Sequence, residues 1–152
     1  MKMMNTMLIV DDIDKSIEFY KKTLNLEVEL DFGANKTLTG GLVLQTLDTY
    51  KEFIKTDKIT FGGNDVEIYF EEDNFDVFVE KLKTLDVNYV HKPIEHEWGQ
   101  RVVRFYDLDK HIIEVGENMK TVCRRFIESG MTPEQVAKRI YGPVEYVYDC
   151  LK

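Results

Sequence analysis

The sequence predicts an α+β protein made of two βαβββ modules and a short helical extension. The stretch NTMLIVDDIDKSIEFYKKTL begins at Asn5, and the similar stretch EIYFEEDNFDVFVEKLKTLD begins 62 residues later, at Glu67. In both, an alternating strand pattern leads into an acidic turn and then into an amphipathic helix, and further alternating stretches follow. We therefore expect one domain at 1–117, with modules at about 3–60 and 61–117, and an extension at 118–152.

The first module contains one helix and four strands by pattern. After the opening strand, Asp11 or Asp12 supplies the N-cap oxygen and the negative charge that favour the first turn of a helix. The apolar residues of this helix recur every three or four positions and predict its buried stripe: Ile13, Ile17, Tyr20 and Leu24. Alternating residues then predict strands at 26–32, 36–39 and 41–46.

The second module repeats this order. The strand at 65–71 has two unlike faces, because Val66, Ile68 and Phe70 alternate with polar residues. We expect its apolar face to pack on helices and its polar face to line a cavity. Asn74 or Asp73 caps the next helix, whose apolar stripe is Phe75, Phe78, Val79, Leu82 and Leu85. Later strands are predicted at 87–90, 100–106 and 112–116.

Composition narrows the class of protein. The chain has 152 residues, 43% of them hydrophobic, enough for one sizeable core. No apolar run approaches the roughly 18 residues of a membrane helix, and the N-terminus lacks the pattern of a secretory signal, so we expect a cytoplasmic protein. Cys123 and Cys150 have no CxxC or histidine partner spacing, which indicates reduced thiols.

The net charge of −8 is unevenly distributed. Residues 118–152 have six basic and four acidic side chains, a net of +2, which leaves −10 on residues 1–117. Such an acidic region repels phosphate backbones, so nucleic acid is not an expected partner.

The sequence of the extension predicts three short helices. The first ends near Gly130, Thr132 and Gln135 have capping-box spacing before the second, and Pro143 opens the third. The phrase MTPEQVAKRIYGPVEYV resembles the helix-turn-helix of transposase and sigma-like DNA binders, but its last helix has two acids against one lysine. We therefore expect an appendage that packs against the core or a dimer mate through Val122, Phe126, Ile127, Val136, Ile140 and Val147. A regulator with a DNA-contacting tail is the weaker alternative.

Two stretches resemble a known family. MMNTMLIVDDIDKSIEFYKKTLNLEVEL is similar to the opening of a bacterial glyoxalase I. GQRVVRFYDLDKHIIEVGE resembles the closing hairpin of the glyoxalase, bleomycin-resistance and extradiol-dioxygenase group, the vicinal oxygen chelate superfamily. The resemblance covers about residues 3–117. It implies a glyoxalase-like fold in which paired modules form a curved mixed sheet, commonly in a homodimer, with a ligand or metal in the concave face.

The resemblance also places four metal-ligand positions. They fall on Asn5, Gln45, Glu67 and Glu114, where glyoxalase I would have histidine, glutamate, histidine and glutamate. Asn and Gln offer only neutral carbonyl oxygens, which suit Ni²⁺ or Zn²⁺ poorly. We therefore expect no catalytic transition metal and no other cofactor. A weakly held divalent ion on Glu67 and Glu114 is the alternative.

Other residues favour the binding of a small molecule. If residues 107–110 form the hairpin turn, Arg104 stands opposite Glu114 and a cross-strand ion pair is expected. Tyr69, Trp98 and Tyr106 would supply aromatic walls, with a lid or a dimer contact as the alternative role of Trp98. Asn5 and Gln45 would hydrogen-bond the ligand, and the alternative is that they are satisfied polar residues in a wet cleft. His91 and His96 are five positions apart across Pro93, a loop spacing without a metal signature, and both are expected to be exposed. His96 is a candidate ligand contact and His91 is not, while His111 is expected to be structural.

Two functions from different classes follow. The first is a metal-free protein that sequesters or senses a small organic molecule, as bleomycin-resistance-type members do. The second is a lyase or isomerase of the glyoxalase I type that uses an oxygen-ligated divalent ion, with Glu67 and Glu114 as catalytic residues.

Overall fold

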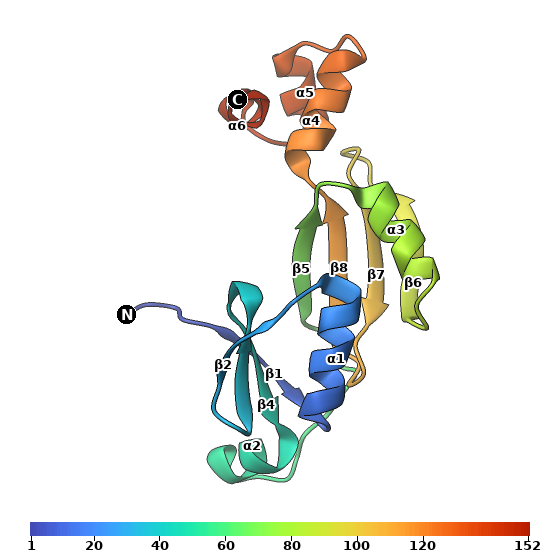
Figure 1. Ribbon diagram of the computed structural model, residues 1–152. Helices are drawn as coiled ribbons and strands as arrows, with labels where there is room; N and C mark the ends of the chain where they lie inside the picture. The colour runs from blue at the N-terminus through green and yellow to red at the C-terminus, as the bar shows by residue number, and fades with distance from the viewer. The chain divides into compact units, whose positions relative to one another are not determined.

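The computed structural model describes residues 1–152, which divide into two compact units. The first unit comprises residues 1–66 and 106–112, and the second comprises residues 67–105 and 113–152. Figure 1 shows a sheet and helices in each of them. The predicted α+β class is confirmed.

The first unit contains the βαβββ module that the sequence predicts. Its sheet has the order β1-β4-β3-β2, in which β1 runs parallel to β4 and the other pairs are antiparallel. This mixed sheet sets Gln45 of β4 beside Asn35 of β3. The elements are β1 (Thr6–Val10), α1 (Ile13–Leu24), β2 (Val28–Asp31), β3 (Asn35–Leu38), the 3₁₀ helix η1 (Thr39–Gly41), β4 (Leu42–Thr46) and α2 (Leu47–Ile54).

Helix α1 begins as predicted, with the Asp12 side chain accepting a hydrogen bond from the Lys15 amide at 3.1 Å. Its buried face differs in part from the predicted stripe. Tyr20 is buried together with Ser16 and Thr23, whereas the predicted Ile13, Ile17 and Leu24 are only partly covered. The apolar spacing therefore identified the helix, while the small polar residues allow its closest packing.

Helix α2 has no counterpart among the predicted elements. Its N-cap residue, Thr46, makes no side-chain capping hydrogen bond, and none of its residues is fully buried. Both of the signals that reveal a helix in a sequence, a cap and a buried stripe, are thus weak here.

The turn at residues 107–111 is organised by the buried carboxylate of Asp107. Its Oδ2 accepts hydrogen bonds from the Tyr20 hydroxyl and from His111 Nδ1, both at 2.8 Å. Its Oδ1 accepts from the amides of Asp109 at 3.0 Å and His111 at 2.8 Å. Burial, followed by the charge of Asp107, raises the pKa of Tyr20 well above its usual value. The structural role predicted for His111 is confirmed.

The second unit repeats the strand order of the first, as β5-β8-β7-β6, so the internal repeat is confirmed. The C-terminal strand β8 is buried along its whole length. The elements are β5 (Glu67–Glu72), α3 (Phe75–Lys83), β6 (Asn88–Glu95), β7 (Arg101–Tyr106), β8 (Ile112–Glu117), α4 (Met119–Glu128), α5 (Pro133–Arg139) and α6 (Val144–Leu151).

Three details of this unit differ from the expectation. Asn74 is the N-cap residue of α3, but its side chain makes no capping hydrogen bond. Strand β6 continues to Glu95, beyond the predicted end at Val90, and includes Pro93. Because β6 lies at the sheet edge, a residue without an amide hydrogen is tolerated there. Val66 precedes β5 and is exposed instead of packing on a helix, while Ile68 and Phe70 are half-buried.

The three C-terminal helices enclose a small core of their own. The predicted capping box is present, since Thr132 and Gln135 each bond the other's backbone amide. Cys123 and Cys150 are free thiols buried inside, and burial raises the pKa of Cys123 to about 12. The residues predicted to pack against the core or a dimer mate pack mainly among themselves instead: Phe126, Ile127, Val136, Ile140 and Val147 belong to this cluster, and Val122 is fully buried.

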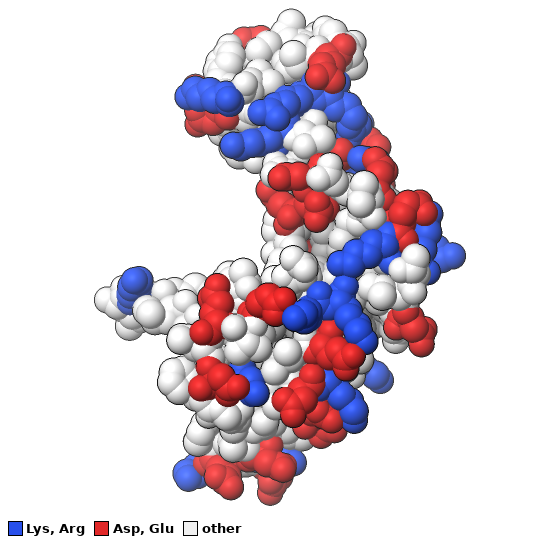
Figure 2. All heavy atoms as spheres, in the orientation of Figure 1, with Lys and Arg blue, Asp and Glu red and all other residues white.

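Charge follows the division seen in the sequence. On the face drawn in Figure 2, Lys and Arg side chains gather over the C-terminal helices, where residues 118–152 have a net charge of +2. No helix is both long enough and apolar enough to cross a membrane.

Candidate functional site

The second unit places one ionisable side chain from each strand of its sheet in a single polar cluster. Arg104, on β7, lies at its centre. Its Nε donates to Glu67 of β5 at 2.9 Å, and its Nη2 pairs with Glu114 of β8. Its Nη1 lies 3.1 Å from His91 Nε2, on β6. The side chains therefore follow the strand order, and the predicted ion pair between Arg104 and Glu114 is confirmed.

The hydrogen bonds of His91 define its tautomer. Its Nδ1 lies 2.8 Å from the carbonyl oxygen of Lys92, so Nδ1 is the donor. Nε2 is then free to accept from Arg104. The guanidinium thus bonds three groups at once, of which Glu114 is the most buried at 8% exposed. This cluster carries two carboxylates, one guanidinium and one neutral imidazole, and hence a net charge of about −1.

A chain of hydrogen bonds connects the aromatic residues of the same unit. Trp98 Nε1 donates to Gln100 Oε1 at 3.2 Å, and Gln100 Nε2 donates to the Tyr69 hydroxyl at 2.8 Å. Tyr69 donates in turn to Glu71 at 3.0 Å. The Trp98 ring also stacks on His96, with 4.1 Å between ring centroids. These contacts hold the aromatic side chains in fixed positions.

The aromatic residues and the charged cluster are neighbours. Tyr69 follows Glu67 by two positions on β5, and alternate residues of a strand share a face. Burial lowers the pKa of His96, and the charge of Arg104 lowers it further. Burial also raises the pKa of Tyr69 to about 12. We call this surface the Arg104 face; it comprises Glu67, Tyr69, His91, His96, Trp98, Gln100, Arg104 and Glu114.

The remaining predicted ligand contacts lie in the first unit. Gln45 is buried, and its amide is already used, because Oε1 accepts from Asn35 at 2.8 Å and Nε2 donates to Thr49. Asn5 is exposed and donates to the carbonyl oxygen of Gly41 at 3.0 Å. The Tyr106 hydroxyl donates to Asn64 at 2.9 Å. Each of these polar groups thus has a partner within its own unit.

Sequence reasoning missed two members of the Arg104 face. Gln100 lies directly before β7 and precedes Arg104 by four positions, and this even spacing could have identified it as a residue of the same face. His91 and His96 were assigned to an exposed loop because Pro93 obscured the continuation of β6. His91 lies on β6 instead, and both side chains are partly buried.

The donor set suits a transition metal poorly. No group of three or more His, Cys, Asp or Glu side chains is arranged to hold a metal ion. The two carboxylates at glyoxalase-type positions, Glu67 and Glu114, are both bonded to Arg104. A metal ion at these carboxylates would have to approach a guanidinium and displace it, which like-charge repulsion opposes.

Comparison of the sequence with known proteins agrees with the glyoxalase-like fold described above. A family model described as a glyoxalase-like domain matches residues 3–120. The protein YraH of Bacillus subtilis (strain 168), itself uncharacterized, is 27% identical over 124 residues, which are 76% of this chain and 97% of YraH.

Solved structures extend the comparison. A protein of unknown function from Agrobacterium tumefaciens str. C58 is 32% identical, with a TM-score of 0.71 over 78% of this chain and 94% of that one. A glyoxalase/bleomycin resistance protein/dioxygenase from Nocardioides is 17% identical, with a TM-score of 0.63 over 77% of this chain and 83% of its own, a likeness of fold alone.

Proposed function

Because the chain belongs to the glyoxalase-like domain family of the vicinal oxygen chelate superfamily, we propose that it binds a small organic molecule without a catalytic transition metal. The observation that supports this proposal is the position of Arg104, which bonds Glu67, Glu114 and His91 together. A fixed organic cation pairs with the two carboxylates that would otherwise bind a metal ion.

The Arg104 face has the composition of a ligand-binding surface. Trp98 stacked on His96 offers an aromatic plane, and the Tyr69 hydroxyl and the half-exposed Glu67 carboxylate offer hydrogen bonds. Small-molecule sites combine aromatic walls with a few placed polar groups in this way. A ligand with a planar or apolar part and hydrogen-bond donors fits this set, since the charged cluster carries a net negative charge.

A metal-dependent lyase or isomerase is the second candidate. One observation favours it, namely that Glu114 keeps the residue type of a glyoxalase I ligand, while Glu67 supplies an oxygen donor at a position where glyoxalase I would have histidine. This alternative requires a divalent ion to bind both carboxylates. It also requires that Glu114→Gln abolish metal uptake and turnover together.

The binding proposal is tested by a thermal-shift screen of small organic molecules that includes metal-free bleomycin as a probe. We expect a hit to raise the melting temperature, since a ligand at 100 times its Kd stabilises a protein by about 2.7 kcal/mol. The shift should disappear in Tyr69→Leu and in Trp98→Leu, which remove the aromatic side chains of the face.

Tyr148→Leu is the matched control, because Tyr148 and Tyr69 are both 46% exposed and Tyr148 lies on α6. The control should retain the full shift. A hit whose shift survives both substitutions on the face would place the ligand elsewhere and contradict the proposal.

A further inference from the structure

The turn between β6 and β7 packs tightly on the first helix of the extension. Gly99, in this turn, has a φ of 85° and is buried. A Cβ atom at this position would overlap the ring of Phe126, on α4. Only glycine satisfies both the backbone conformation and the close approach. The helix and the turn are therefore shaped to fit each other at this point.

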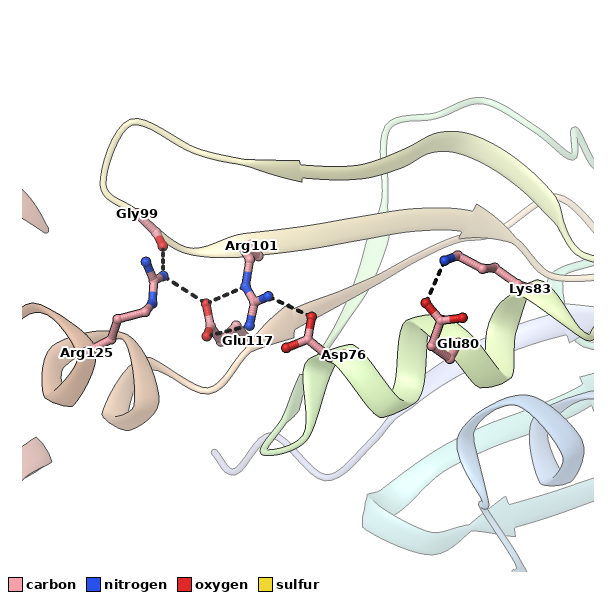
Figure 3. A network of polar contacts seen from close by, with 7 residues as sticks. All are labelled: Asp76, Glu80, Lys83, Gly99, Arg101, Glu117 and Arg125. Carbon is pink, nitrogen blue, oxygen red and sulfur yellow. Dashed lines mark hydrogen bonds and ion pairs between the residues drawn. The ribbon is translucent and has the colours of Figure 1, made fainter.

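A second contact fixes the same turn to α4. Arg125 Nη2 donates to the carbonyl oxygen of Gly99 at 2.6 Å and to the carboxylate of Glu117 at 3.1 Å. Figure 3 shows Glu117 between Arg125 and Arg101, with Arg101 reaching on to Asp76 at 2.8 Å. Glu117 is only 1% exposed, so its two arginine partners compensate a buried charge. The network joins α4 to β7, β8 and α3.

The residues on either side of Gly99 both belong to the Arg104 face. Trp98 precedes it and Gln100 follows it. Gln100 Nε2 donates to the backbone carbonyl of Glu117 at 2.9 Å as well as to the Tyr69 hydroxyl. Gln100 thus connects the aromatic side chains to the strand end from which α4 begins.

From these contacts we propose that α4 positions the Trp98 turn of the ligand-binding face, with Arg125 and Phe126 as positioning residues. The carbonyl of Gly99 is held by Arg125 and its Cα by Phe126, so the side chains of Trp98 and Gln100 are presented at a fixed angle. Arg139 of α5 lies over the same Phe126 ring, 6.0 Å from its centroid, and brings the second helix of the extension into contact with this support. The effect on ligand affinity rests on the proposed function, whereas the positioning itself does not.

Acrylamide quenching of Trp98, the only tryptophan, tests the positioning without a ligand. In Arg125→Met the quenching constant should rise roughly twofold, because the half-buried ring gains contact with solvent when the turn loosens. Arg124→Met is the matched control on the same helix, where Arg124 is exposed, and should leave quenching unchanged. All variants are compared at a temperature where circular dichroism shows the native signal.

Phe126→Leu provides a milder second variant, which keeps an apolar side chain but removes the ring against Gly99. Its quenching constant should also rise. Unchanged quenching in both Arg125→Met and Phe126→Leu would overturn the proposal.

The effect of α4 on ligand binding is measured with a small molecule that raises the melting temperature of the wild type in the thermal-shift screen. Its Kd should weaken on the order of tenfold in Arg125→Met, equivalent to about 1.4 kcal/mol, and stay unchanged in Arg124→Met. Raised quenching with an unchanged Kd would overturn the link between α4 and binding. If no probe binds the wild type, the proposed function fails, and quenching alone still decides whether α4 positions the turn.

Discussion

Replacing Arg101 with methionine is expected to lower the free energy of unfolding by about 3 kcal/mol, because it leaves a buried charge with one partner fewer. Arg101 bonds both carboxylate oxygens of Glu117, at 2.9 and 3.2 Å, and stacks on Phe75 at 5.2 Å from the ring centroid. Methionine keeps the apolar contact and removes the charge. Chemical denaturation followed by circular dichroism measures the change.

A double-mutant cycle separates the ion pair from the packing. The variant with both Arg101→Met and Glu117→Gln should be more stable than Arg101→Met alone, since it removes the buried charge that is left with Arg125 as its one arginine partner. Lys83→Met is the surface control in Figure 3, because its pair with Glu80 is exposed and should contribute less than about 1 kcal/mol. Equal losses in Arg101→Met and Lys83→Met would contradict the account of Glu117.

Replacing Arg104 with alanine is expected to create affinity for divalent metal ions. The substitution removes the cation that bonds Glu67, Glu114 and His91. It leaves two carboxylates on the adjacent strands β5 and β8 and an imidazole on β6, and these side chains must move closer together to share an ion. These are donors that Mn²⁺ and Zn²⁺ accept. We expect binding to tighten by about tenfold or more over the wild type, or about 1.4 kcal/mol. Isothermal titration calorimetry measures this gain.

Arg104→Lys is the matched control, because it keeps a positive charge in the cluster and should not gain affinity. A gain in the lysine variant equal to that in the alanine variant would show that loss of charge is not the cause. No gain in Arg104→Ala would contradict the idea that the guanidinium keeps metal ions away from these carboxylates.

The fold could be predicted well from the sequence because its signals are local and occur twice. Short stretches of residues contain the signals for the helix caps at Asp12 and Thr132 and for the apolar stripe of α3. Helix α2 lacks both kinds of signal, and β6 is interrupted in pattern by Pro93. These elements are defined by their surroundings in the fold, which single-sequence periodicity does not contain.

The site could be predicted only in part, because its contacts join residues far apart in the chain. The pair of Arg104 and Glu114 followed from the short hairpin between β7 and β8, where the register is fixed by the turn. The contacts of Arg104 with Glu67 and His91 depend on the order of four strands, which no local pattern reveals. The hydrogen-bond partners of the buried Gln45 lie on a neighbouring strand and a helix in the same way.

Titration of chelator-treated wild-type protein with Ni²⁺, Zn²⁺, Mn²⁺ and Mg²⁺ tests the central claim most directly. Because Arg104 bonds both carboxylates, we predict no stoichiometric uptake of any of these ions by the wild type. Uptake of one equivalent that is lost in Glu114→Gln would contradict the metal-free binding function and support the metal-dependent lyase or isomerase.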